Sequence, residues 1–150
     1  MQPIKWPDFQ FDPRGDRDKP YRMRSPHSVM TGIVGHHLNT KYFTLYPTGL
    51  LMLLTGFRWD GGTNAVDDHA MIAASGPHDV ICDLTVSGVI PYKWRKVGDA
   101  LLRDHLKFYT LELLSDEPWW FRTLVAQWRW PRWAAVRMNS IRVGWKLAHG

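Results

Sequence analysis

A carboxylate on the apolar face of a predicted helix constrains this sequence more than any other feature. Residues 92–114 have the length and apolar spacing of one long helix, and Asp99 falls within its apolar stripe. The other members of that stripe are Leu102, Leu106 and Leu113. Because an unpaired buried carboxylate is too costly to keep charged, the fold has to supply a partner for Asp99. Arg95 or Arg103 of the same helix could do so, but the position among leucines favours a partner on another helix.

A second predicted helix with polar groups precedes Asp99. The sequence DGG at 60–62 predicts a tight turn, and the small apolar residues after it predict a helix that packs closely against a partner. Pro77 interrupts this helix. Either the helix kinks there, or a new helix begins with Pro77 in its first turn and carries His78 and Asp79 at its N-terminal end.

The spacing of these polar groups allows a helical hairpin. We expect His78 to lie within hydrogen-bond reach of Asp99 across two antiparallel helices, with Asp60 nearby. Two simpler interpretations remain open. Asp60 before two glycines could serve only as a turn residue, and His78 with Asp79 could cap a helix that starts at Pro77.

The first third of the chain favours extended structure. Five prolines prevent a helix from running through residues 1–28, which therefore predict an extended arm. The aromatic residues of this arm are too apolar for a disordered tail, so we expect the arm to lie on its own domain or on a neighbouring subunit. Residues 29–57 combine strand-favouring residues with turn signals. The LLMLL run at 50–54 is typical of a buried strand, although its pattern does not exclude a helix.

Together these segments predict an α+β domain with a small antiparallel sheet from the N-terminal third, a helical pair and a basic aromatic C-terminal helix. We divide the chain into a Pro-rich arm (1–28), a core domain (29–117) and a Trp-rich helical tail (118–150). The single cysteine, Cys82, excludes an intramolecular disulfide and a cysteine-only zinc site. No apolar run reaches the roughly 18–20 residues that span a bilayer, and the N-terminus lacks the apolar core of a signal peptide. Folding in the cytoplasm is therefore expected.

The tail carries the positive charge of the chain. It has basic residues and no acidic ones, and it accounts for more than the whole net charge of +5. Tryptophans alternate with arginines along it, and both residue types dominate the hot spots of protein interfaces. The predicted interface residues are Trp119, Trp120, Trp128, Trp130, Trp133, Arg129 and Arg132. They predict docking on other copies of the chain or on another protein; a core role, an anionic membrane surface and, least favoured, nucleic acid are the alternatives.

Residues 42–114 resemble a phage-associated family, domain-of-unknown-function family 1353. The resemblance rests on the DGGT turn at 60–63, the alanine-rich helix that ends in His78-Asp79, and Asp99 followed by apolar residues. Members of that family typically show a Thr-Asp-Gly-x-Ser turn, a His-Asp-x-Leu-Tyr helix and a later Asp. The resemblance implies a protein of tailed-phage or prophage genomes, and the biochemistry of the family is not established.

The same set of residues is similar to the catalytic helices of small bacterial and fungal phospholipases A2. That resemblance implies that His78 deprotonates water and that Asp99 orients its imidazole. It also implies that Asp79 and Asp60 hold calcium, which would polarise an ester carbonyl. The cysteines that flank the site in those enzymes are missing here, so the resemblance is one of site geometry.

Other histidines allow one further comparison. His36, His37 and His69 could supply metal ligands, and a His…His-Asp…Asp pattern is similar to that of the HD phosphohydrolases. Strand-rich surroundings and a separation of 20 residues between Asp79 and Asp99 argue against that all-helical fold.

Two functions from different classes remain. The first is a phage or prophage virion or assembly component, associated with a tail or baseplate, that docks through its arm and tail on other copies or on other phage structural proteins. Such a protein would be assembled in the host cytoplasm and located in the virion. The second is a small hydrolase that acts on lipid or cell envelope during entry or lysis, with calcium or another divalent metal as its cofactor.

Overall fold

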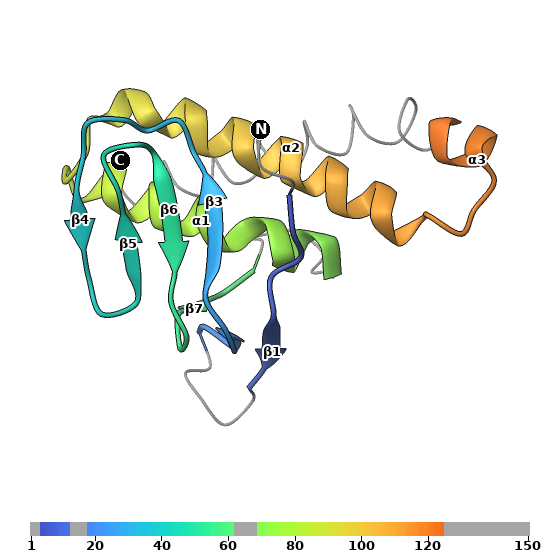
Figure 1. Ribbon diagram of the computed structural model, residues 1–150, viewed down its shortest axis with the longest axis horizontal. Helices are drawn as coiled ribbons and strands as arrows, with labels where there is room; N and C mark the ends of the chain where they lie inside the picture. Colours follow the sequence, from blue (N-terminus) through green and yellow to red (C-terminus); the bar gives the residue numbers. More distant parts are fainter. Residues whose placement is uncertain (1–3, 13–17, 62–68, 125–150) are drawn as a thin grey trace.

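The protein has an α+β fold, as the sequence predicts. The computed structural model describes residues 4–12, 18–61 and 69–124, which form small antiparallel sheets and a pair of long helices (Figure 1). The helical elements are α1 (His69–Val86), the 3₁₀-helix η1 (Tyr92–Trp94), α2 (Arg95–Leu113) and α3 (Trp119–Leu124). Figure 1 places the four-stranded sheet at one end of the helical pair and α3 at the opposite end. None of the helices in the described ranges is both long and apolar enough to cross a membrane.

The three-stranded sheet contains two strands from the predicted arm, so the arm is part of the folded domain. Its strands, in the order β1-β2-β7, are β1 (Phe9–Phe11), β2 (Tyr21–Met23) and β7 (Arg58–Trp59), and both pairings are antiparallel. Pro7, Pro20 and Pro26 lie outside these strands, so they limit strand length without preventing pairing. The predicted boundary at residue 28 falls inside the next strand, and the arm is therefore continuous with the core.

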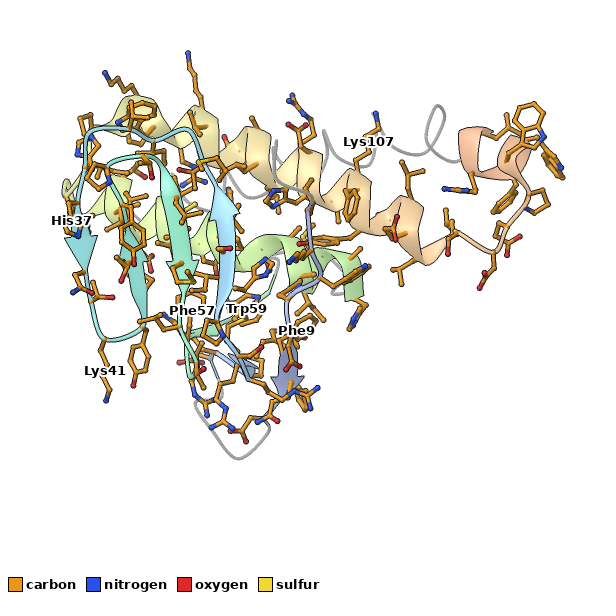
Figure 2. The ribbon with its side chains drawn as sticks, viewed as in Figure 1. Phe9, His37, Lys41, Phe57, Trp59 and Lys107 are labelled. Carbon is orange, nitrogen blue, oxygen red and sulfur yellow. The ribbon has the colours of Figure 1, made fainter. Side chains whose placement is uncertain are left out.

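Aromatic residues of the arm pack on the protein's own domain, which was one of the two expected locations. The ring of Phe9 lies edge-on to that of Trp59, with centroids 5.6 Å apart (Figure 2). Trp6 packs on Tyr109 of α2 at a centroid distance of 4.5 Å, and the Tyr109 hydroxyl donates a 2.8 Å hydrogen bond to the Lys5 carbonyl. Phe11 differs, because 62% of it is exposed.

The four-stranded sheet confirms the strand prediction for residues 29–57. It has the order β3-β6-β5-β4, with β3 (His27–Met30), β6 (Leu50–Leu53), β5 (Phe43–Leu45) and β4 (Leu38–Asn39), all antiparallel. The apolar run at 50–54 is thus a strand, with Leu51 and Leu53 in the core. The turn before it needs Gly49, which has φ of 89° and whose added Cβ would lie 3.0 Å from the Gly32 backbone nitrogen.

Helix α1 runs through Pro77 as one continuous helix. The interpretation in which Pro77 starts a new helix and His78 and Asp79 cap it is therefore wrong, since both residues lie in the helix interior. Proline removes one helical hydrogen bond and disturbs the preceding turn. In that turn the Ile72 carbonyl accepts a 3.0 Å bond from Trp59 Nε1 and another 3.0 Å bond from Ser75 Oγ. The bond that Pro77 removes is the one to the Ala73 carbonyl. The bond from Trp59 is a tertiary contact with the neighbouring carbonyl of the same turn.

Helices α1 and α2 form the predicted antiparallel pair and lie side by side (Figure 1). The helices lie close together at Gly98, where an added Cβ would lie only 2.8 Å from Ile81 Cγ2. Leu102 and Leu106 are buried against α1, whereas Leu113 is 53% exposed, so the apolar stripe ends before the helix does. Beyond α3 the chain is outside the described residues, and so are the predicted interface residues Trp128, Arg129, Trp130, Arg132 and Trp133.

Candidate functional site

The predicted contact between His78 and Asp99 is confirmed. His78 Nε2 lies 3.0 Å from Asp99 Oδ1, and the two side chains are only 3% and 4% exposed. The α1 and α2 backbones bring these groups together because Gly98, next to Asp99, lets the helices approach closely. A short polar contact thus lies inside an otherwise apolar helix interface.

Asp99 has a second partner on its own helix. Arg95 Nε lies 3.3 Å from the same oxygen, Asp99 Oδ1, one helical turn away. Both predicted kinds of partner are therefore present, one on the same helix and one across the pair. Arg103, the other candidate, instead contacts Asp104 at 3.1 Å on the surface. The buried cluster of Arg95, Asp99 and neutral His78 carries no net charge, which limits the cost of its burial.

The environment of His78 keeps its imidazole neutral. Burial lowers the pKa of His78 most, the Asp99 hydrogen bond opposes that effect, and the Arg95 charge lowers the pKa further. A neutral imidazole has one N–H donor, and the carboxylate of Asp99 fixes it on Nε2. The other ring nitrogen, Nδ1, is then the basic one.

Cys82 lies beside this ring, one turn along α1. Its Sγ is 3.5 Å from both ring nitrogens of His78, a distance at which a thiol makes a weak hydrogen bond. Burial raises the pKa of the Cys82 thiol far above its ordinary value, so the thiol stays protonated and is not a nucleophile at neutral pH. The i, i+4 spacing of His78 and Cys82 in the sequence was the signal that could have predicted this contact.

Asp60 and Asp79 form a second polar contact next to the first. The pKa of Asp79 is raised well above its usual range by burial, by the negative charge of Asp60 and by a hydrogen bond with Asp60. Asp79 therefore keeps its proton over a pH range in which an ordinary carboxyl group is ionised. Asp60 is exposed, and its charge also acts on the pKa of His78, so it lies near the buried cluster. Asp60 is therefore more than a turn residue.

The carboxyl groups of Asp60 and Asp79 are the kind of oxygen ligand that a hard divalent cation binds. Calcium takes carboxylate oxygens among its six to eight oxygen ligands, and a cation would relieve the repulsion that now raises the pKa of Asp79. Asp60 and Asp79 would supply only two of the side chains that such a calcium site needs. Over the described ranges, no group of three or more His, Cys, Asp or Glu side chains is arranged to hold a metal.

The histidines considered as extra ligands contact aromatic rings instead. His37 stacks on Tyr46 with a centroid distance of 6.1 Å, and His36 lies edge-on to Trp94 at 6.3 Å. His69 stacks on the arm residue Trp6 at 5.2 Å. The structure therefore does not bring these histidines to His78 and Asp99.

Two other buried histidines were not singled out from the sequence. His27 on β3 and His105 on α2 are 8% and 6% exposed. Burial and then the proximity of His105 lower the pKa of His27 to about 4, and burial also lowers that of His105. Alternation along β3 was the available signal, because His27 and Val29 point inward while their neighbours are exposed.

Comparison with protein-family models, with curated proteins and with solved structures finds no match for this chain. The functional argument therefore depends on the geometry of the site and on the motif resemblances in the sequence.

Proposed function

We propose that the protein is a small hydrolase in which His78 and Asp99 activate water beside a cation held by Asp60 and Asp79. The observation that carries this proposal is the 3.0 Å contact between His78 Nε2 and Asp99 Oδ1. His78 is followed by Asp79, whose pKa is raised by burial and by Asp60. Strongly perturbed groups that gather in one place are typical of catalytic sites. The motif resemblance to phospholipases A2 supports the same roles for these residues.

In this proposal His78 is the general base. The imidazole is neutral before reaction, so its Nδ1 can accept a proton from water. The imidazolium that forms is stabilised by Asp99, which also keeps the Nε2 proton in place. Arg95 opposes permanent protonation of His78, which keeps the base available at neutral pH.

Asp60 and Asp79 would hold the cation, and calcium matches their oxygen chemistry. When bound, it would polarise an ester carbonyl and stabilise negative charge on its oxygen. Asp79 has to be ionised for this, so calcium would compete with its proton, and the affinity for calcium should fall as pH is lowered.

The test combines thermal stability with activity. Calcium should raise the melting temperature of the wild type by mass action, and Asp79→Asn should abolish that rise. His78→Gln should reduce calcium-dependent hydrolysis of phospholipid vesicles and p-nitrophenyl esters by at least about 100-fold, the usual contribution of a general base. His37→Gln, a change of the same kind outside the site, is the matched control. Unchanged melting in millimolar calcium, or no hydrolysis by the wild type, would contradict the proposal.

A second function is favoured by a different observation. Trp119, Trp120 and Phe121 on α3 are 76%, 54% and 38% exposed. They lie at the end of the molecule opposite the four-stranded sheet (Figure 1). Exposed aromatic groups of this kind mark docking surfaces. The protein would then be a phage virion or assembly component that contacts other copies or other phage structural proteins, and its buried polar cluster would be a structural network.

Light scattering separates the two functions. An assembly component should be oligomeric as the full chain, and Trp119→Ser with Trp120→Ser should shift it toward the monomer. Tyr92→Ser, which alters a 55% exposed aromatic residue outside α3, should leave the oligomer intact. A full-length protein that is monomeric at all concentrations would contradict the assembly proposal and leave the hydrolase.

A further inference from the structure

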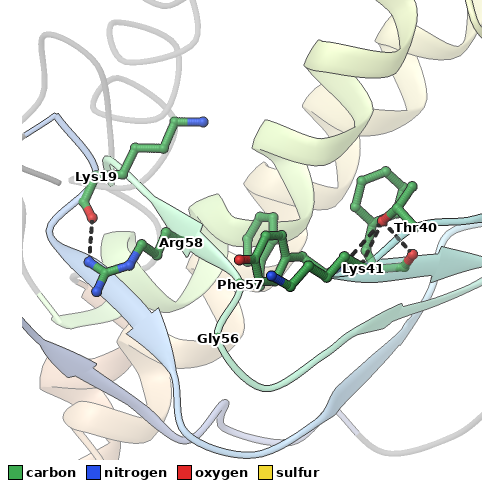
Figure 3. Close-up of a pocket in the computed structure, with 8 residues that line it drawn as sticks. Lys19, Thr40, Lys41, Gly56, Phe57 and Arg58 are labelled. Carbon is green, nitrogen blue, oxygen red and sulfur yellow. Dashed lines mark hydrogen bonds between the residues drawn. The ribbon is translucent and has the colours of Figure 1, made fainter. Parts of the chain in front are cut away.

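A basic pocket lies apart from the His78 cluster, where the two sheets adjoin. It has a volume of about 420 Å³ and is lined by residues from the start of β5, the start of β7 and the segment before β2 (Figure 3). Lys19 and Arg58 lie on one side of it, and Lys41 lies on the other. A volume of this size is within the range of small-ligand sites.

Arg58 is held in position at the pocket wall. Its Nη2 forms a 2.7 Å ion pair with Asp12, and its Nη1 donates a 3.4 Å hydrogen bond to the Lys19 carbonyl. The Arg58 and Asp12 side chains are about three-quarters buried, at 25% and 24% exposure. Lys19, Lys41 and Arg58 bring three basic side chains to the lining; Arg58 pairs with Asp12, and Lys19 also lies within electrostatic range of Asp79.

The remaining wall is aromatic. Phe57 is buried and stacks on Trp59 with centroids 5.7 Å apart, so its ring is fixed. Tyr42 is 43% exposed, and the Lys41 ammonium lies 5.1 Å from its ring centroid. Gly56 has φ of 89°, and an added Cβ there would lie 3.5 Å from the Tyr42 ring, so glycine lets the backbone lie close beside that ring. Aromatic side chains and positively charged side chains therefore line the same pocket.

We propose that this pocket binds a phosphate monoester whose organic group is a flat ring. A phosphate group suits a pocket with three basic side chains in its lining, because lysine and arginine are the side chains that most often bind phosphate. The ring would pack on Tyr42 and Phe57, where aromatic stacking adds to apolar burial. The ligand contacts neither His78 nor Asp99, so this binding does not depend on the proposed hydrolase.

Isothermal titration of the full chain with phenyl phosphate tests the proposal. Phenyl phosphate should bind saturably at millimolar concentration, inorganic phosphate more weakly, and benzyl alcohol more weakly still. Lys41→Gln should raise the dissociation constant of phenyl phosphate at least about tenfold, which corresponds to about 1.4 kcal/mol. Lys107→Gln removes the same charge from the exposed face of α2, well away from Lys41 (Figure 2), and should leave the constant unchanged.

Three results would overturn the proposal: no saturation by phenyl phosphate, equal weakening by Lys41→Gln and Lys107→Gln, or equal binding of phenyl phosphate and inorganic phosphate. Tyr42→Leu is a second variant that keeps the charge and removes the aromatic ring, so it should weaken phenyl phosphate more than inorganic phosphate. His78→Gln should retain binding whether or not the hydrolase proposal holds. Circular dichroism of each variant shows that it is folded.

Discussion

Gly98→Ala is the most direct perturbation of the helix pair that holds the candidate site. The new Cβ would lie 2.8 Å from Ile81 Cγ2, closer than real Cβ atoms come to their neighbours, and 3.2 Å from Ile81 Cβ, which is a tight contact. Ile81 cannot swing aside easily, since a β-branched side chain in a helix has one strongly preferred rotamer. Either the rotamer changes or the helices separate.

The magnitude follows from two opposing effects. Overpacking of a core costs about 1–3 kcal/mol, whereas alanine in a helix interior is favoured over glycine by about 1 kcal/mol. The Gly98→Ala protein should therefore lose up to about 2 kcal/mol of unfolding free energy. In an Ile81→Ala background the clashing Cγ2 is gone, and the same Gly98→Ala change should become stabilising by up to about 1 kcal/mol.

Urea denaturation of the four proteins in this double-mutant cycle measures the coupling. A coupling energy near zero, with Gly98→Ala equally stabilising in both backgrounds, would refute the close packing of α1 against α2. The cycle also reports on the site, because Asp99 follows Gly98. Separation of the helices should lengthen the 3.0 Å contact with His78 and reduce any activity that depends on it.

Three further outcomes are expected from urea denaturation. The pKa of Asp79 is raised in the folded state, so the folded protein loses stability as pH rises above the ordinary pKa of an aspartate. Metal-free Asp79→Asn should therefore be more stable than wild type at pH 8, and equal stabilities would contradict the contact between Asp60 and Asp79. Because the pKa of His27 is lowered from 6.5 to about 4, the unfolded chain takes up the proton first, and this histidine should cost about 2 kcal/mol of stability between pH 7 and pH 5. His27→Gln should reduce the acid-dependent loss by that amount, and an unchanged pH profile would show that His27 is not buried. Trp59→Phe should cost about 1–3 kcal/mol, since the Ile72 carbonyl loses its indole donor beside Pro77; a change near zero would mean that this bond adds nothing to the helix.

The central contact of the candidate site could be predicted from the sequence because helical geometry fixes which residues share a face. Asp99 lies among leucines at helical spacing, and the cost of a buried charge requires a partner. Those two facts predict a polar contact across a helical pair, and the structure places His78 there. The predicted strands within residues 29–57 depended in the same way on local propensity and turn residues.

Features that depend on distant contacts could not be predicted in this way. The local sequence alone favours a break at Pro77, whereas α1 is continuous and the Trp59 indole contacts it in the turn before the proline. Pairing of β1 and β2 with β7 joins strands of two or three residues, too short to show a periodic pattern. The proximity of His27 to His105 likewise arises only when β3 packs near α2.

The contact between Tyr109 and the Lys5 carbonyl has a consequence for the order in which this chain folds during synthesis. It joins residues 104 positions apart, and the Trp6 ring packs at the same place. Because synthesis runs from the N-terminal side, Lys5 and Trp6 lack this packing partner until α2 has been made, and closing so long a loop carries an entropic cost. The sheet of residues 27–53 can form earlier, because its strands are close together in the sequence. Packing of Trp6 on Tyr109 should thus be a late step in the folding of the newly made chain.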